Sequence, residues 1–243
     1  MKKYKAIMFD MDGTLIPMDV KAFSEGYFYD LHKKLASGGH DYDHAFLVKA
    51  IWTGTGAMVK NDGSCYNTER FWQVFKQMLN EDDATMKELE ALCDDFYSHE
   101  FMEAKRFTGD NPLAVKAVWL AHQKADQVIL ATNPLFPMAG QITRMKWVDL
   151  RPEDFDLVTA YETDTYCKPN PKYFESVCER AGVTPNECLM IGNDENEDMY
   201  SASSVGMDCY LVTGSDIPCA EHPWTGRRGS FDELIEFLKG LPD

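Results

Sequence analysis

Residues 6–16 read Ala-Ile-Met-Phe-Asp-Met-Asp-Gly-Thr-Leu-Ile, an apolar run followed by two aspartates and a glycine. The apolar run 6–9 predicts a buried strand of a parallel sheet. Asp10 and Asp12 follow at a spacing of two, so the alternation of strand side chains places both carboxylates on one side of the strand end. Gly13 lets the backbone turn away. Because two adjacent carboxylates repel each other, a hard divalent cation such as Mg²⁺ is their natural partner; a strand followed by a plain acidic turn is the alternative.

The composition narrows the class of protein. With 243 residues and an apolar fraction of 44%, the chain can form one large domain, or a core domain with an insert. The net charge of -16 argues against a nucleic-acid or anionic-membrane partner, because phosphate groups would be repelled. Seven cysteines without a C-x-x-C pair favour reduced thiols and a cytoplasmic protein. The first apolar run ends at Asp10, so we expect no signal peptide, and no later run approaches the length of a membrane span.

Residues 20–107 show helical periodicity and no convincing strand. We expect four helices there: 20–35, 44–59 with a break near Gly54 and Gly56, a third capped by Asn67, and a fourth opened by a capping box at residues 85–88.

After Gly109, strands alternate with helices. The pattern predicts strands at 127–131, 156–160, 188–191 and 209–212, and helices at 111–120, 134–147, 171–181, 197–205 and 230–238. Such βα units build a parallel sheet with right-handed crossovers. The predicted fold is therefore α/β: a Rossmann-like parallel sheet with helices on both faces, plus an inserted α-helical cap domain. We assign residues 1–17 and 108–243 to the core domain and 18–107 to the cap.

Three further polar clusters follow later strands or the connections after them. They are Thr132 with Asn133, Lys168 in the sequence Cys-Lys-Pro-Asn-Pro, and the acidic loop 192–198. Ligands bind beyond the carboxyl ends of parallel strands, and an insertion leaving after Asp12 emerges beside that edge and can cover it. Each cluster alone has a simpler interpretation: a helix cap, a solvated lysine, and acidic residues at a helix N-terminus.

Taken in order, paired aspartates, a Thr after a strand, a Lys-Pro and an acidic loop after Gly resemble the haloacid dehalogenase-like superfamily of phosphatases and phosphotransferases, in the branch with a helical cap between the first two motifs. The resemblance implies that Asp10 is the nucleophile and forms an aspartyl-phosphate, and that Asp12 is the general acid and base. It further implies that Thr132, helped by Asn133, binds the transferring phosphoryl group, and that Lys168 holds phosphate oxygens and partly neutralises Asp10. Mg²⁺ would be held by Asp10, the backbone carbonyl of Asp12 and the acidic loop.

The acidic loop departs from the family pattern. The family usually has an Asp directly after the glycine, and here that position is Asn193. Either the Asn193 amide oxygen binds the metal, or Asp194 takes over; we favour Asp194 because a carboxylate supplies the charge that Mg²⁺ needs. The alternative is that Asp194 caps the following helix while Asn193 coordinates. The presence of Asp12, which the dehalogenases of this superfamily lack, argues against carbon–halogen hydrolysis.

These observations predict a magnesium-dependent phosphatase that acts on a small phosphorylated metabolite. A phosphomutase acting on a sugar phosphate and a non-catalytic binding protein on the same fold are the alternatives. We expect a cytoplasmic monomer or small homo-oligomer with no nucleic-acid or membrane partner. The cap would choose the substrate, but no residue of it is identified as the reader; the segment Gly54–Gly56 is a candidate loop.

Overall fold

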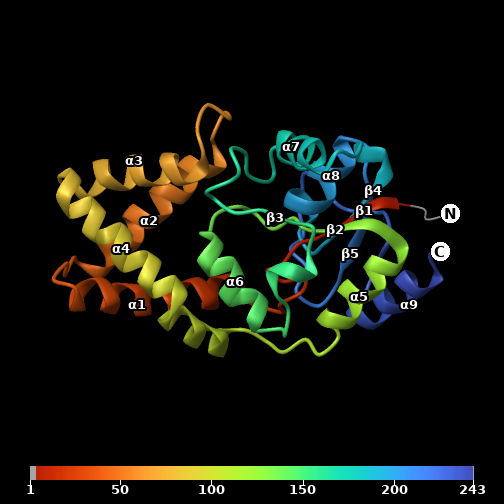
Figure 1. Ribbon diagram of the computed structural model, residues 1–243, viewed down its shortest axis with the longest axis horizontal. Coiled ribbons are helices and arrows are strands. Elements are labelled where there is room, and N and C mark those ends of the chain that lie inside the picture. Colours follow the sequence, from red (N-terminus) through yellow and green to blue (C-terminus); the bar gives the residue numbers. More distant parts are fainter. Residues whose placement is uncertain (1–3, 243) are drawn as a thin grey trace.

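A parallel six-stranded sheet forms the core of the part of the molecule on the right of Figure 1, and the computed structural model describes residues 4–242. Its order is β3-β2-β1-β4-β5-β6. The strands are β1 (Tyr4–Phe9), β2 (Ala125–Leu130), β3 (Leu157–Val158), β4 (Cys188–Gly192), β5 (Asp208–Val212) and β6 (Arg228–Gly229). In the register, Phe9 lies between Leu130 and Ile191. The segments that follow β1, β2 and β4 therefore begin at one edge of the sheet, with β1 between the other two.

Helices cover both faces of this sheet. They are α5 (Ala114–Lys124), α6 (Met138–Lys146), α7 (Lys172–Ala181), α8 (Ser201–Ser204) and α9 (Phe231–Gly240). Ile7 and Phe9 of β1 point into one apolar cluster, which α5 and α9 complete, whereas Ala6 and Met8 point into a second cluster completed by α7 and α8. Strand β1 is thus buried on both faces, as its unbroken apolar run predicts. The predicted fold class is confirmed.

A helical cap is inserted between β1 and β2 and lies on the left in Figure 1. It consists of α1 (Val20–Ser37), α2 (His44–Val59), α3 (Asn67–Leu79) and α4 (Asp83–Ser98), followed by a 3₁₀ segment, Glu100–Phe107. The aromatic rings of Phe23, Tyr27 and Phe101 in this part pack against Phe136 and Trp147 of the sheet-bearing part.

Three local predictions about the cap are wrong. Helix α2 runs without a break through Gly54, where a Cβ would come within 2.8 Å of the Phe71 ring, so the glycine permits close packing of α2 on α3. Asn67 does not cap α3, because Tyr66 occupies the cap position. Helix α4 begins before the expected capping box, since the Asp82 side chain accepts a hydrogen bond from the backbone N–H of Thr85.

The two chain segments that join the cap to the rest of the molecule lie side by side. The N–H of Gly109 donates to the carbonyl of Pro17 at 2.6 Å, and Met18 forms an antiparallel bridge with Thr108. The assignment of 1–17 and 108–243 to the core and 18–107 to the cap stays a prediction of where the two parts separate. Among residues 4–242, no helix has the length and apolar character that crossing a bilayer requires.

Candidate active site

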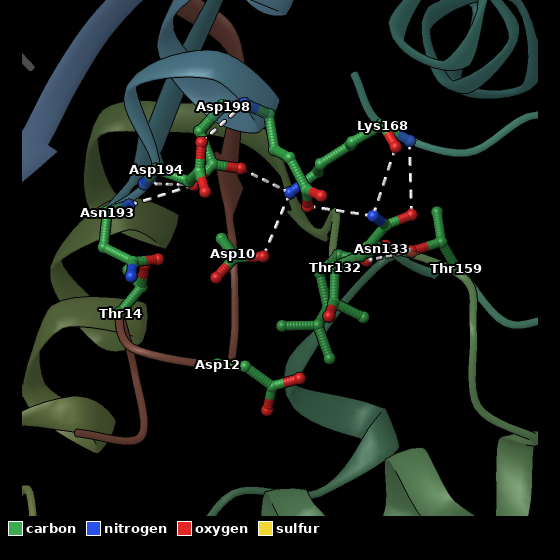
Figure 2. A network of polar contacts seen from close by, with 12 residues as sticks. Asp10, Asp12, Thr14, Thr132, Asn133, Thr159, Lys168, Asn193, Asp194 and Asp198 are labelled. Carbon is green, nitrogen blue, oxygen red and sulfur yellow. Dashed lines mark hydrogen bonds and ion pairs between the residues drawn. The ribbon is translucent and has the colours of Figure 1, made fainter. Parts of the chain in front are cut away.

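Asp10 is the first residue after the central strand, and its carboxylate is buried. The ammonium group of the fully buried Lys168 donates to Asp10 Oδ1 at 3.0 Å and to Asp198 Oδ1 at 2.6 Å (Figure 2). Burial raises the pKa of Asp10 to about 7, and the charge of Lys168 opposes that rise. Burial acts to lower the pKa of Lys168, but the carboxylates of Asp10 and Asp198 outweigh it and hold this pKa above its usual value.

The turn after Asp10 is fixed by Gly13 and Asn193. Gly13 has a φ of +87°, and a Cβ there would lie 2.1 Å from Asn193 Nδ2, so both the backbone angle and the space require glycine. The Asn193 amide has its own partners. Its Oδ1 accepts from the Thr14 hydroxyl at 3.1 Å, and its Nδ2 donates to the Ser215 carbonyl at 2.8 Å. Asn193 thereby joins the turn after β1 to the loop after β5.

Asp12 is held by a different cation. Its Oδ2 accepts from Nη1 of Arg144, a completely buried arginine of α6 whose Nη2 donates to Gln141 and whose guanidinium lies 4.0 Å from the centre of the Phe136 ring. Figure 2 shows the Asp12 carboxylate turned away from the network around Lys168. The predicted repulsion between the two carboxylates is therefore relieved by two separate ion pairs, one for each aspartate.

The acidic loop folds around Asp198. Its Oδ2 accepts from the backbone N–H groups of Asn193 and Asp194, both at 3.0 Å, and a Cβ on Gly192 would clash with it at 2.2 Å. Asp194 caps the helical segment that follows, since its Oδ1 accepts from the N–H groups of Asn196 and Glu197 at 2.7 and 2.8 Å. Capping, the alternative for Asp194, is thus observed, but it uses only Oδ1 and leaves Oδ2 outside these two bonds.

Thr132 and Asn133 follow β2 at the same edge. The carbonyl of Thr132 accepts from the hydroxyls of Thr159 and Tyr173. The Asn133 amide is tied to its neighbours: Oδ1 accepts from the N–H of Lys168 at 3.2 Å, and Nδ2 donates to Glu197 Oε2 at 2.9 Å. Asn133 therefore positions Lys168.

A cavity of about 320 Å³ lies over these groups. Asp10, Asp12, Thr132, Asn133, Asn193 and Asp194 all line it, so six of the seven predicted site residues meet around one space; Lys168 lies beneath it, bonded to Asp10. Residues of α1 and α2 form the opposite wall. The roles of these residues stay predictions, but their convergence follows from the strand register.

The oxygen groups of this site fit a divalent cation. Asp10, Asp12, Asp194, Glu197 and Asp198 bring five carboxyl groups together, whereas Lys168 and Arg144 bring two positive charges. Burial, followed by the nearby charge of Asp194, raises the pKa of Glu197 to about 8, which reflects this excess of acidic groups. Hard divalent cations prefer such oxygen ligands, and a bound cation would offset the excess.

Three side chains of the site were absent from the predicted set: Arg144, Glu197 and Asp198. The sequence could have identified Asp198 as a site residue, because its spacing of four from Asp194 places both on one helical face. No feature of the sequence identifies Arg144 as a site residue, since nothing in residues 138–146 distinguishes this arginine from a solvated one.

Comparison with known proteins identifies the family of the chain. A family model described as haloacid dehalogenase-like hydrolase matches residues 4–206. The chain is 26% identical over 215 residues to a phosphoglycolate phosphatase of Pseudomonas putida, covering 86% of this chain and 69% of the relative. It is 22% identical over 244 residues to a ribulose-1,5-bisphosphate 5-phosphatase of Halopiger xanaduensis, covering 98% of both. The predicted class, a phosphoric monoester hydrolase, agrees with both relatives, which are phosphatases.

Solved structures share the fold. A phosphatase of this family from Thermococcus onnurineus superposes with a TM-score of 0.59 at 20% identity, covering 97% of this chain and 98% of that one. The chain spans only 18% and 39% of the length of two other curated relatives that it matches. The family model covers most of the sequence, and the motif residues converge at the edge where the resemblance places them. The chain belongs to the haloacid dehalogenase-like hydrolase family.

Proposed function

We propose that this chain is a magnesium-dependent phosphatase that hydrolyses a small phosphorylated metabolite through an aspartyl-phosphate on Asp10. One observation carries the proposal: the buried Asp10 carboxylate lines the cavity at the end of the central strand, with one oxygen held by Lys168. Its second oxygen can attack a phosphorus atom bound in the cavity, because Lys168 fixes the carboxylate at the edge of the sheet.

The chemistry divides into two displacements. In the first, an oxygen of Asp10 forms a bond to phosphorus, the ester P–O bond breaks, and Asp12, in its carboxylic acid form, gives its proton to the leaving oxygen. In the second, Asp12 takes a proton from water, the water oxygen bonds to phosphorus, and the Asp10–phosphorus bond breaks to release inorganic phosphate. Arg144 holds the Asp12 carboxyl in place, and Thr132 donates to the phosphoryl oxygens. Mg²⁺, held by Asp10, the Asp12 carbonyl and Asn193 or Asp194, would supply positive charge against those oxygens.

The names of the two curated relatives support a small phosphorylated substrate. We propose a cytoplasmic protein, a monomer or small homo-oligomer, with no nucleic-acid or membrane partner. No observation favours the phosphomutase. Its intermediate would carry a second phosphate, and none of the described residues that line the cavity is Lys, Arg or His. A non-catalytic role leaves the paired Asp10 and Asp12 unexplained.

The test is release of phosphate from acetyl phosphate and 4-nitrophenyl phosphate with Mg²⁺ present. Excess EDTA should abolish turnover, and added Mg²⁺ should restore it. Asp10→Asn should lose at least about a thousandfold in kcat, because the amide is a poor nucleophile, while its circular dichroism spectrum stays unchanged. An Asp10→Asn variant with full activity would rule out the aspartyl-phosphate.

A further inference from the structure

The wall of the cavity that faces Asp10 is apolar and aromatic. It is formed by two adjoining cap helices, α1 and α2, on the left of Figure 1. The side chains that matter here are Phe23, Tyr27, Phe28, Trp52, Thr55 and Val59.

Charge is distributed unevenly over the cavity. The side nearest the sheet edge carries the carboxyl groups of the site, and the cation Lys168 is engaged there by Asp10 and Asp198. Among the described residues that line the cavity, those contributed by the cap include no charged side chain. A second anionic group on a substrate would therefore lose its hydrating water against an uncharged wall and would also be repelled by the nearby carboxylates. Both effects weaken its binding.

Two of the hydroxyls on the cap side, those of Thr55 and Tyr27, are already bonded within the cap. The Thr55 hydroxyl donates to the carbonyl of Ile51 at 3.0 Å, and the Tyr27 hydroxyl shares a hydrogen bond with Tyr97. The wall thus offers few groups that could read the hydroxyls of a sugar.

The aromatic rings are held in fixed positions by one another. The Phe28 and Trp52 rings meet edge to face with centroids 5.4 Å apart, and the Phe23 and Tyr27 rings lie 5.1 Å apart. Trp52 is nonetheless 49% exposed and lines both this cavity and an adjoining open hollow beside Lys21, Glu25 and His44, although large aromatic side chains gain most from being covered. An apolar ligand would cover it without reorganising the helices.

We infer that the leaving group of the substrate is uncharged and apolar, with an aromatic ring that packs on Trp52, so that the enzyme prefers the phosphate monoester of an aromatic alcohol over substrates that carry a second anion. The inference rests on the proposed function. A cavity of 320 Å³ suits a phosphoryl group with one ring, since ligand sites of about 300 Å³ or more enclose small molecules.

Two substrates that differ by a single carboxylate give the sharpest test. Phenyl phosphate and 4-carboxyphenyl phosphate have similar leaving oxygens, and the carboxylate of the second would face the cap wall. We expect kcat/KM to favour phenyl phosphate by roughly tenfold or more. Acetyl phosphate, whose leaving group is too small to reach the wall, serves as the reference reaction.

Single substitutions test whether the cap wall causes the preference for phenyl phosphate. Trp52→Ala should lower kcat/KM for phenyl phosphate roughly tenfold and leave acetyl phosphate unchanged, because only the larger group contacts the ring. Trp119→Ala is the matched control: Trp119 is 59% exposed on α5 and does not line the cavity, so neither reaction should change. Thr55→Lys places a positive charge on the wall and should narrow or reverse the preference against 4-carboxyphenyl phosphate.

The outcomes separate the two proposals. If acetyl phosphate is hydrolysed through Asp10 but the two aryl phosphates react equally, or if Trp52→Ala leaves their ratio unchanged, the substrate class is wrong and the proposed function stands. If none of the three phosphates is hydrolysed with Mg²⁺ present, the proposed function fails and this inference fails with it.

Discussion

At the scale of single residues, the site separates the tasks of its two aspartates through their cations. Lys168 neutralises Asp10, while Arg144 pairs with Asp12 and is itself fixed by Gln141 and Phe136. A carboxyl that must give and take a proton gains from being held in one orientation, because misplacement of a catalytic group slows the reaction. We therefore regard Arg144 as a positioning residue for Asp12.

We expect Arg144→Met to lower kcat at least tenfold with little change in KM, since the substrate does not contact Arg144. The free energy of unfolding should fall by about 1–3 kcal/mol, because the Asp12 carboxylate loses its ionic partner but is itself partly exposed. A double-mutant cycle with Asp12→Asn measures the coupling of the pair. Additive losses in kcat would show that Arg144 does not act through Asp12.

A second prediction at this scale concerns Asp194, whose two carboxylate oxygens can serve different purposes. One oxygen caps a helix, and the other is the candidate metal ligand. Asn caps helices as well as Asp does. Asp194→Asn should therefore keep the melting temperature and raise the Mg²⁺ concentration needed for half-maximal activity, whereas Asp194→Ala should change both.

Asn193→Ala is the matched control. The Asn193 amide links the turn after β1 to the loop after β5, because its oxygen accepts one hydrogen bond and its nitrogen donates another. It should lower the melting temperature and alter the Mg²⁺ titration less than Asp194→Asn does. A normal Mg²⁺ titration for Asp194→Asn would mean that Asp194 is only a cap and that another group binds the metal.

At the scale of elements, hydrogen bonds from α3 join the cap to the rest of the molecule in addition to its two linkers. The first residues of α3 reach the loop before Lys168: the N–H groups of Asn67 and Thr68 donate to the carbonyls of Asp164 and Tyr161, both at 2.9 Å, and Asn67 Nδ2 donates to Cys167 Sγ at 3.2 Å. Opening of the cap must break these bonds. They explain why Asn67 is fully buried at the beginning of a helix that it does not cap.

We predict that Asn67→Ala speeds limited proteolysis near residues 17–19 and 106–110, because the cap then separates from the core more often. Bound Mg²⁺ with a phosphate analogue should slow cleavage of both the variant and the parent protein. Thr53→Ala, an exposed change on α2 whose hydroxyl only donates to its own helix, is the control and should behave as the parent. Equal cleavage of Asn67→Ala and the parent protein would contradict a fastening role.

At the scale of the whole molecule, the net charge of -16 opposes the approach of any anionic substrate. The two cations of the site are buried and paired, so they steer little at long range. We expect kcat/KM for phenyl phosphate to rise severalfold between about 10 mM and 150 mM NaCl at saturating Mg²⁺, because salt screens the repulsion. A rate that falls with salt would instead indicate attraction by a local positive field.

The sequence alone predicts five of the six strands of the described sheet, the inserted helices and the candidate residues Asp10, Asp12, Thr132 and Lys168; it does not predict the two-residue edge strand β6 (Arg228–Gly229), which has no apolar run. These features depend on local periodicity and on side chains that directly follow strands, and parallel register alone brings strand ends to one edge. Helix starts in the cap were misread, because Tyr66 and Asp82 take positions that propensity assigns to Asn67 and Thr85.

The distribution of charge over the site depends on contacts between remote segments of the chain and is seen in the three-dimensional structure alone. Arg144 meets Asp12 across 132 positions of the chain, Asn193 meets Thr14 across 179, and the apolar wall of α1 and α2 faces Asp10 because the cap folds back over the strand ends. Such contacts leave no periodic pattern in the sequence, since each depends on packing between elements that are remote in the chain.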